Sequence, residues 1–328
     1  MKHISILVPD SQTTPSTIAC IAGAYEIFTE AEAFWQQGGH VAQFKIEMVS
    51  ATRKTQSDSI FSVKAHTTAD ELTKTHLILI PSSLVRSYDT ATRSNQSLIT
   101  WVAMQHAKGA EVASMCTGAF MLAATGLLEG MTCSTHWAVS ERFAGLYPDV
   151  KLQTERLITD ENGIYTNGGA YSFLHLLLYL VEKHYNRQIA VRCAKIFQID
   201  MDRSMQAEFS IFTGQKQHDD ELVLKAQAYI ERHYRQPLSI GALSDKLHVG
   251  RRNFDRRFIR ATGLTPLDYL QRVRTEAAKR AFETTRKTVN EVMYSVGYSD
   301  ARAFREVFQR ITGLSPADYK AKYNRQAA

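Results

Sequence analysis

The side chain with the clearest potential for covalent chemistry is Cys116, in the stretch Ser114-Met115-Cys116-Thr117-Gly118. An apolar, β-rich run precedes this cysteine and an apolar helical pattern follows it, so we expect the thiol at a sharp turn from a strand into a helix. The N-terminus of a helix offers free N–H groups and the positive end of a dipole, which lower a thiol pKa and bind anions. The pattern is typical of a nucleophilic cysteine or a small-molecule site, and equally of an inert buried cysteine.

A base for such a thiol would be His136, which follows twenty residues later in Thr135-His136-Trp137. The fold, and not the spacing in the sequence, would have to bring the imidazole and the thiol together. His136, His175 and His184 do not share metal-ligand spacing with cysteines or acids, so we expect no metal site.

A cluster of arginines follows the segment 238–250. Apolar residues in that segment recur at spacings of three and four, which predicts a short helix, and Gly250 is expected to form the tight turn after it. Phe254 and Phe258 would face inward on the next helix, leaving the charged residues outside: Arg251, Arg252, Asp255 and Arg256. A short basic helix held on a first helix fits the major groove of DNA, where arginine binds guanine and aspartate accepts from cytosine.

This pattern occurs twice in the chain. Residues 252–270 recur as residues 302–320 at an offset of 50, which pairs Phe254 with Phe304 and Gly263 with Gly313. Upstream apolar residues match at an offset of 49, and the one-residue slip falls in the turn, where an insertion costs least. The second unit then presents its own charged residues, Asp300, Arg302, Arg305 and Glu306. The residues nearer the helix ends are expected to contact phosphates: Arg257, Arg260 and Arg310.

Both copies, with the tail TG-L-[ST]-P-x-D-Y and the segment VGYSD (Val296–Asp300), resemble the DNA-binding domain of the AraC/XylS family of transcription regulators. The resemblance covers about the last third of the chain. It implies two helix-turn-helix units joined by a long helix, here Pro266–Thr284, which place their recognition helices in successive major-groove segments. It also implies double-stranded promoter DNA as the partner.

The positive charge of the chain is concentrated in its C-terminal third. From Asp219 onward there are 21 Lys and Arg against 13 Asp and Glu, a balance of +8, whereas the preceding residues hold 18 against 20, a balance of −2. A basic region of this kind is the electrostatic footprint of a phosphate-binding domain. The four cysteines form no C-x-x-C pair and the start MKHISILVPD has no secretory pattern, so we expect a cytoplasmic protein without disulfides. The longest apolar run, residues 174–181, is too short to span a membrane.

The first half of the chain alternates between strand and helix patterns. We expect strands at 3–8, 44–50, 76–81 and 111–115, helices at 16–35, 98–108, 119–125 and 170–184, and two strands around the turn at 160–163. This order predicts an α/β, doubly wound parallel sheet. Residues 188–213 have a helical pattern, and the polar stretch after them marks a boundary. The expected organisation is a ligand-sensing domain at 1–190, a helical linker at 191–218 and an all-α DNA-binding domain at 219–328.

The segment Ser114–Trp137 resembles the PfpI and class I glutamine amidotransferase-like superfamily, in the branch fused to AraC-type domains. The resemblance covers the first 190 residues and implies a flavodoxin-like fold. In enzymatic relatives the cysteine at the turn is the nucleophile, a histidine assists, and an acid from the first helix contacts the thiol. Here Cys20 stands where that acid is expected, and Ser114 replaces the glycine that usually opens the motif.

Two interpretations of the first domain are open at this point. As an enzyme it would use Cys116 as nucleophile and His136 as base, whereas as a sensor its crevice at the carboxyl ends of the strands would bind a metabolite without turnover. The fused DNA-binding domain and the missing acid favour the sensor. We therefore predict no enzymatic activity and no cofactor, with Cys116 and His136 as vestigial catalytic residues. The predicted ligand-binding residues are Cys116, Thr117, His136, Trp137 and Cys20.

Taken together, these patterns predict a homodimeric transcription regulator that binds promoter DNA and responds to a small-molecule effector. The alternative is a cysteine-dependent hydrolase or amidotransferase-like enzyme that its second domain tethers to DNA.

Overall fold

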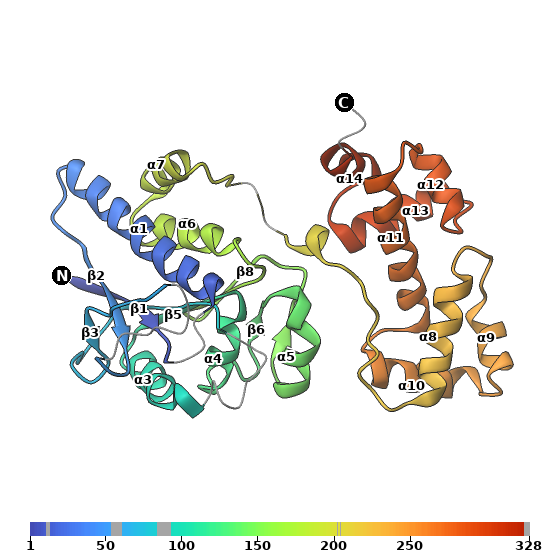
Figure 1. The fold of residues 1–328 in the computed structure, drawn as a ribbon, viewed down its shortest axis with the longest axis horizontal. Coiled ribbons are helices and arrows are strands. Elements are labelled where there is room, and N and C mark those ends of the chain that lie inside the picture. The colour runs from blue at the N-terminus through green and yellow to red at the C-terminus, as the bar shows by residue number, and fades with distance from the viewer. Residues whose placement is uncertain (11–13, 54–60, 84–92, 202, 204, 325–328) are drawn as a thin grey trace. The chain divides into compact units, whose positions relative to one another are not determined.

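The computed structural model describes residues 1–10, 14–53, 61–83, 93–201, 203 and 205–324. The chain forms two compact units, Met1–Gln206 and Ala207–Ala328 (Figure 1). The boundary between them lies inside the segment 191–218, which we expected to be the linker. No helix in the described ranges is both long and apolar enough to cross a bilayer.

The N-terminal unit is built on a sheet that has seven strands in the described chain, in the order β3-β2-β1-β4-β5-β9-β8. Neighbouring strands are parallel except for β8 and β9, which are antiparallel. The bounds are β1 Lys2–Val8, β2 Phe44–Ser50, β3 Thr67–Thr68, β4 Leu77–Ile80, β5 Glu111–Met115, β8 Ile158–Glu161 and β9 Ile164–Asn167. The winding direction reverses between β1 and β4, which is the flavodoxin-like form of the predicted doubly wound sheet.

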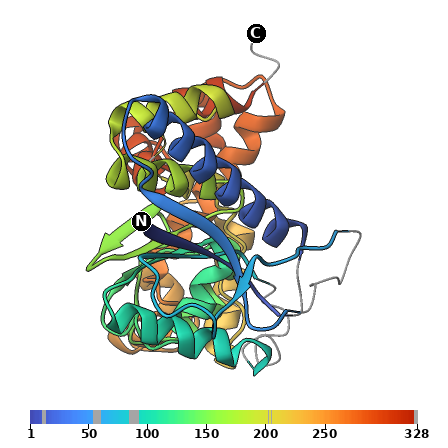
Figure 2. The same cartoon turned by 90° about the vertical axis from the view of Figure 1, so that its left-hand side faces the viewer.

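Helices cover both faces of this sheet, which is why β1 is apolar on both sides. One face carries α1 (Pro15–Gln37), α6 (Phe173–His184) and α7 (Arg187–Phe197), and Ile4 and Ile6 of β1 belong to that apolar cluster. The other face carries α3 (Gln96–Ala107), α4 (Ala119–Ala123) and α5 (Ser140–Leu146), and Leu7 belongs to its cluster. Figure 2 shows α1 on one side of the strands and α3 and α4 on the opposite side.

The region 151–168 contains the predicted turn, but its strands differ from the expectation. The hairpin is β8–β9, and its turn residues Asn162 and Gly163 have φ values of 53° and 77°, as a tight hairpin turn requires. Lys151–Leu152 (β7) instead pairs in parallel with Thr132–Cys133 (β6). The two-residue strands β3, β6 and β7 are too short to leave a periodic signal in the sequence.

The predicted helix at 188–213 is wrong beyond Phe197. Helix α7 packs Ile189, Ala190 and Cys193 into the cluster around α1. The helix ends where Gln198 adopts a left-handed conformation, with φ of 53°. Beyond this point Ile199 and Met201 still pack against the same cluster, so the apolar residues that suggested a longer helix are placed there without one. Of the expected helical linker 191–218, the first part therefore belongs to the N-terminal unit, and a short 3-10 turn, Ala207–Phe209, opens the next unit.

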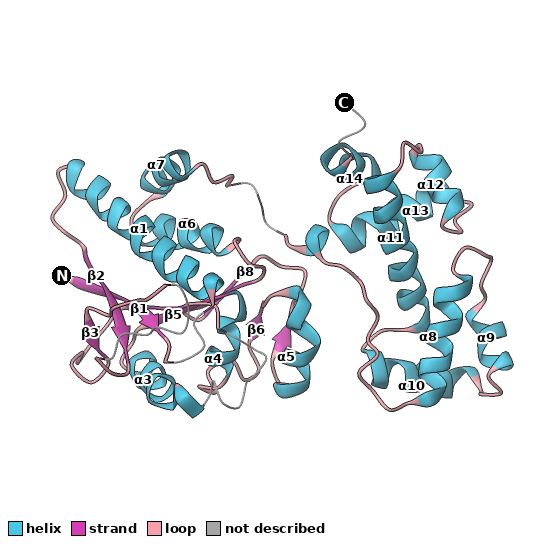
Figure 3. Cartoon of the chain, in the orientation of Figure 1, coloured by secondary structure: helices cyan, strands magenta, loops and turns pink. Residues whose placement is uncertain are grey.

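The C-terminal unit is all-α in its described residues, as predicted (Figure 3). Its helices are α8 Glu221–His233, α9 Ile240–Lys246, α10 Arg251–Thr262, α11 Pro266–Thr284, α12 Val289–Ser295, α13 Ala301–Thr312 and α14 Pro316–Tyr323. The joining helix α11 has the predicted bounds. It supplies Tyr269 to the apolar cluster around Phe254 and Phe258, and Phe282 to the cluster around Phe304 and Phe308. Each helix-turn-helix unit thus has its own core, and one helix passes through both.

Candidate functional site

The C-terminal unit contains two structurally equivalent helix pairs, α9–α10 and α12–α13. The first helices are related by an offset of 49 and the second helices by an offset of 50, so the extra residue lies in the turn of the second pair, as predicted. Ser239 and Thr288 cap the first helix of each pair through their side chains. Gly263 and Gly313 end the second helices in the left-handed conformation, with φ of 71° and 81°.

The turn residue predicted for the first pair is wrong. Gly250 has an ordinary φ of −62° and is the N-cap of α10, whereas the left-handed position is His248, with φ of 52°. The equivalent residue of the second pair is Gly297, with φ of 88°. Histidine is among the few non-glycine residues that adopt this conformation with some frequency. The left-handed residue of the first turn is therefore His248, two residues before the predicted Gly250.

Arg274 forms a joint between the C-terminal end of α8 and the turn of the second pair. Arg274 of α11 donates from Nε to the carbonyl oxygen of Tyr234 at 2.8 Å and from Nη2 to that of Gln236 at 3.0 Å. Its guanidinium also lies 5.1 Å from the ring centre of Tyr298, in the second turn. A cation satisfies the last carbonyl groups of a helix and interacts favourably with its dipole. Arg274 thus fixes the end of α8 to the turn of the second pair.

The outward faces of α10 and α13 carry the predicted DNA-binding residues. Arg251 pairs with Asp255 through Nε at 2.8 Å, and Arg302 pairs with Glu306 through Nε at 2.8 Å. Within the described residues Arg252 and Arg305 are exposed and form no ion pair. On its outward face each helix therefore presents an arginine held by a carboxylate beside an arginine that forms no ion pair.

Other predicted DNA contacts are already used within the protein. Asp300 caps α13 by accepting from the Ala303 N–H at 2.6 Å. Arg256 donates from Nη2 to Asn253 Oδ1 at 3.0 Å and stays exposed. Arg257, which we expected at a phosphate, grips both carboxylate oxygens of Asp220 at 2.8 and 2.6 Å. Asp220 is the N-cap of α8, so Arg257 ties α10 to α8 and its expected role is corrected.

The turn after β5 has the sharp geometry that we predicted. Cys116 has a φ of 56°, an unfavourable value for a residue with a side chain, and it starts a short 3-10 turn that leads into α4. Gly118 lies against the end of β4, because a Cβ there would be 2.6 Å from the Pro81 carbonyl oxygen and 2.7 Å from that of Ile80. The end of β4 therefore supports the strained turn that begins at Cys116.

The thiol of Cys116 does not have the predicted low pKa. Burial raises the pKa of Cys116 to about 11, and contacts from Thr117 and Ser82 lower it by less. Cys20 on α1 also contacts Ser82, and burial raises the pKa of Cys20 to about 12. At neutral pH both thiols are protonated, because the low-dielectric surroundings outweigh the turn's N–H groups. The structure does bring Cys20 close to Cys116, with Ser82 in contact with both, as the resemblance implied.

His136 follows Thr135, and among the described residues no hydrogen bond is found between its ring and the Cys116 thiol. Its Nδ1 accepts from the Ala138 N–H at 3.1 Å, and its ring lies against Trp137 at 5.4 Å between centres. Burial lowers the pKa of His136, so the ring is neutral at pH 7. The link to the turn runs through the neighbouring Thr135, whose Oγ1 donates to the Cys116 carbonyl oxygen at 3.1 Å.

Thr117 uses its side chain to hold the segment after β4. Its Oγ1 lies 3.0 Å from Ser82 Oγ, accepts from the Ser83 N–H at 2.9 Å and donates to the Ser83 carbonyl oxygen at 2.6 Å. Ser82, which sequence reasoning missed, thus contacts Cys20, Cys116 and Thr117. Its only signal was its place just after a buried strand. Groups of three or more histidine, cysteine or acidic side chains that could hold a metal do not occur among the described residues.

Comparison with known proteins assigns both units. The DJ-1/PfpI family model matches residues 19–183, half of the chain, and a helix-turn-helix domain model matches residues 243–322. The chain belongs to the DJ-1/PfpI family. Solved structures of this family share the fold: a ThiJ/PfpI family protein from Pseudomonas syringae has a TM-score of 0.51 at 19% identity, covering 63% of this chain and 78% of its own. DJ-1beta of Drosophila melanogaster has a TM-score of 0.50 at 12% identity, covering 61% and 98%.

Similar curated proteins include HTH-type transcriptional regulators of Pseudomonas aeruginosa. The HTH-type transcriptional regulator GbdR is 23% identical over 218 residues, which cover 64% of this chain and 58% of GbdR. The HTH-type transcriptional regulator CdhR is 24% identical over 245 residues, which cover 74% of this chain and 71% of CdhR. The chain therefore matches a little over half the length of GbdR. The predicted resemblance, a PfpI-like domain followed by an AraC-type helix-turn-helix domain, is confirmed.

Proposed function

We propose that this protein is a sequence-specific DNA-binding transcription regulator. The observation that carries the proposal is the pair of equivalent helices, α10 and α13, that a single helix and the Arg274 joint hold in one unit. Helix-turn-helix proteins insert such second helices into the major groove. The exposed arginines Arg252 and Arg305 are proposed to contact the DNA bases. Supporting contacts are proposed for Arg251, Arg256 and Arg302. Asp255 and Glu306 orient Arg251 and Arg302, and Asp300 caps α13.

The N-terminal unit is proposed to sense a small effector in the crevice around Cys116. Ligands of doubly wound sheets bind at the carboxyl ends of the strands where the winding reverses, and Cys20, Ser82 and Cys116 lie there. The proposed ligand-binding residues are Cys116, Thr117, His136, Trp137 and Cys20. Thr117 acts mainly by hydrogen-bonding to Ser82 and Ser83, which follow β4. Regulator names among the relatives support a role in signalling for this unit.

One observation favours the alternative, a cysteine-dependent enzyme. The φ of 56° at Cys116 is the strained turn geometry that exposes nucleophiles in other hydrolases. Against it stand the protonated thiol, the absent contact with His136 and the cysteine in place of an acid. We therefore propose binding without turnover, and the proposal involves neither a metal nor a cofactor.

The deciding experiment is selection of genomic DNA by the full-length protein, followed by footprinting at physiological salt. We expect a protected site in two adjacent major-groove segments. Arg252→Ala and Arg305→Ala should each lose about 1–3 kcal/mol on that site and little on random DNA, whereas Arg192→Ala, in the N-terminal unit, should bind normally. Equal loss on random DNA, or no preference for any sequence, contradicts the proposal.

Assembly and location are part of the same proposal. A homodimer would double the number of recognition helices on DNA, which is the usual arrangement for helix-turn-helix proteins, and light scattering of the full-length protein tests it. All four cysteines are free in the structure. Free buried thiols suit the reducing cytoplasm, where promoter DNA is found in bacteria.

A further inference from the structure

The two recognition helices, α10 and α13, carry the charges of their outer faces in a different order. The fifth and sixth residues of α10 are Asp255 and Arg256, whereas the same places in α13 are held by Arg305 and Glu306. The second residue of each helix is an arginine, and the fourth and eighth are buried phenylalanines. The outer charges therefore differ around an unchanged inner face.

This difference moves the ion pair of each helix by one residue. In α10 the pair joins the first and fifth residues, Arg251 and Asp255. In α13 it joins the second and sixth residues, Arg302 and Glu306. One residue of an α-helix corresponds to a rotation of about 100°. The two helices thus present their carboxylates in different directions.

The two arginines that are proposed to contact bases are consequently out of register. Arg252 is the second residue of α10, whereas Arg305 is the fifth residue of α13. These places differ by about 4.5 Å along the helix axis, which exceeds the spacing of about 3.4 Å between neighbouring base pairs. The residue of α10 that corresponds to Arg305 is Asp255. A hydrogen-bond acceptor in one helix therefore stands where the other helix has a donor.

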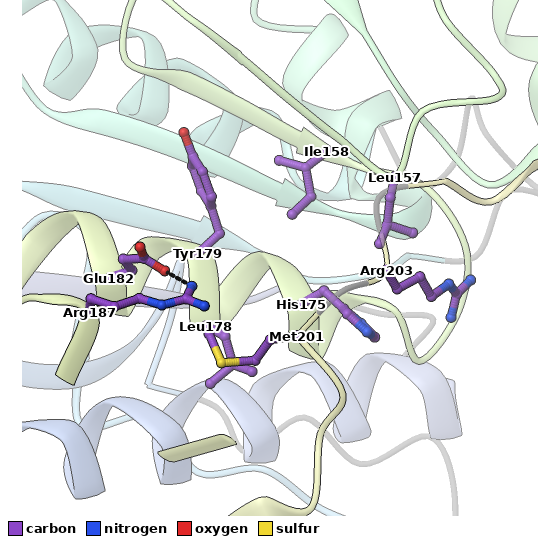
Figure 4. Close-up of a pocket in the computed structure, with 9 residues that line it drawn as sticks. All are labelled: Leu157, Ile158, His175, Leu178, Tyr179, Glu182, Arg187, Met201 and Arg203. Carbon is purple, nitrogen blue, oxygen red and sulfur yellow. Dashed lines mark hydrogen bonds and ion pairs between the residues drawn. The ribbon is translucent and has the colours of Figure 1, made fainter. Parts of the chain in front are cut away.

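The ion pairs leave the ends of their arginines uncovered. Arg251 and Arg302 both reach their carboxylates through Nε, at 2.8 Å. The ion pair of Arg187 with Glu182 in the N-terminal unit is different, because its carboxylate meets the terminal Nη1 at 2.6 Å (Figure 4). An arginine that is held through Nε keeps both terminal nitrogens for a ligand. The pairs on α10 and α13 can therefore stay intact while these helices contact DNA.

We propose, on the basis of the DNA binding proposed above, that α10 and α13 recognise different base sequences. The residue that decides the difference is the fifth of each helix, Asp255 in α10 and Arg305 in α13. A carboxylate accepts from the amino group of cytosine, whereas a guanidinium donates to guanine. Cytosine therefore faces Asp255 at the place where guanine faces Arg305.

The DNA target then consists of two unlike half-sites, where a half-site is the stretch that one recognition helix contacts. Each helix accepts only its own half-site, so the order of the half-sites fixes the orientation of the chain on DNA. A mismatched base pair weakens binding about 5- to 150-fold. Exchange of the two half-sites creates at least one mismatch under each helix.

The test is selection from random DNA by the full-length protein and by a variant whose α10 has the outer charges of α13. The variant combines Arg251→Ala, Asp255→Arg and Arg256→Glu, and it leaves the buried phenylalanines in place. We expect the wild type to select two unlike half-sites and the variant to select the second of them twice. Leu267→Ala is the matched control, because it also gives the first copy the residue of the second copy, but on α11. It should select the wild-type site.

Two further measurements do not depend on the triple variant. The wild type should bind the selected DNA at least about tenfold more weakly when its two half-sites are exchanged at unchanged spacing. Arg305→Asp should change one preferred base of the second half-site from guanine to cytosine and leave the first half-site unaltered.

Three outcomes would overturn separate recognition by the two helices. They are selection of two like half-sites by the wild type, equal binding of the exchanged DNA, and an unchanged base preference in Arg305→Asp. Selection of the wild-type site by the triple variant would likewise show that these charges do not set the sequence. If the wild type selects no sequence at all, the proposed function itself fails, and the two failures are thereby distinguishable.

Discussion

The amide group of Gln206 occupies the space in which a Cβ on Gly168 would lie. Its Nε2 donates to the carbonyl oxygens of Thr135 at 2.9 Å and of Thr154 at 2.7 Å, and the side chain is fully buried. Thr135 is also the residue that donates to the carbonyl oxygen of Cys116. Gln206, the last residue of the N-terminal unit, is thus linked through Thr135 to the turn at Cys116.

Gly168→Ala tests this anchor. The added methyl group would overlap the Gln206 amide, and over-packing of this kind costs about 1–3 kcal/mol. Urea unfolding of the full-length protein should show a loss of that size in the transition of the N-terminal unit. Gly145→Ala is the matched control, because a Cβ there meets no neighbouring atom within 4 Å. Equal effects of the two substitutions would mean that the buried amide is not an anchor.

The start of the DNA-binding unit can be tested with two fragments. Residues before 219 pack on α11: the Phe212 N–H donates to Glu276 at 3.2 Å, its ring lies 5.1 Å from that of Tyr269, and the buried Lys279 donates to the Ser210 carbonyl oxygen. A fragment 219–328, our expected domain, exposes these groups. It should be less stable than 207–328 by at least about 1–2 kcal/mol, from the apolar surface of the half-buried Phe212 alone. If the two fragments unfold with equal denaturation midpoints and slopes, the DNA-binding domain begins at residue 219, as expected from the sequence.

The Arg274 joint predicts a loss of stability when its charge-assisted hydrogen bonds are removed. Arg274→Ala leaves the carbonyl groups of Tyr234 and Gln236 without these donors, which costs about 1.5–3 kcal/mol for bonds to a charged group. Urea unfolding of the 207–328 fragment measures it. Arg280→Ala provides the comparison, since Arg280 is exposed and its nearest carboxylate is 3.9 Å away. The joint has no energetic role if both variants unfold at the same urea concentration.

The ion pair of Arg257 with Asp220 predicts a pH dependence. The guanidinium lowers the pKa of Asp220. A carboxyl whose folded pKa is depressed stabilises the fold above its unfolded pKa, about 4, and this stabilisation is lost as the pH falls through the folded pKa. Arg257→Ala should therefore be less stable than the wild type at pH 7, and the difference should shrink below pH 4. A difference that stays constant down to pH 2 would show that the side chain acts only through packing.

The buried thiol of Cys116 predicts slow alkylation. Because its pKa is about 11, the thiolate fraction at pH 7.5 is far below that of a free cysteine with pKa near 8.5. Iodoacetamide labelling, resolved by peptide mass, should be slower at Cys116 than at a free cysteine by about 300-fold, the ratio of the two thiolate fractions. Labelling faster than that of free cysteine would favour the enzyme, and turnover abolished by Cys116→Ala would establish it.

The parts of the fold that were predictable are those with a local pattern. The bounds of α11 follow from Pro266 at its start and from a continuous helical period, and the duplication follows from matched residues such as Phe254 and Phe304. The turn at Cys116 follows from a strand pattern that changes at one residue into a helical one. These signals depend on neighbours in sequence, which is why they could be read directly.

Most of the misassigned features depend on burial or on contacts between distant residues. Arg257 and Asp220 are 37 residues apart, and no period in the sequence links them. The raised pKa of Cys116 comes from burial by several elements, whereas the sequence showed only the adjoining helix. His136 Nδ1 accepts from its neighbour Ala138, a local bond that the residue types alone do not predict. Ile199 and Met201 carry apolar residues past the end of α7 and pack on the same cluster without a helix, so their spacing does not mark where α7 ends.

The two copies of the helix-turn-helix unit are no longer interchangeable. His248 shows that the first turn accommodates a side chain, whereas a Cβ at Gly297 would lie 2.6 Å from the Tyr234 carbonyl oxygen. His248→Gly would only remove atoms from the first turn, whereas Gly297→His would drive a Cβ into the backbone of Tyr234. At this position the first copy accepts a side chain and the second copy excludes one.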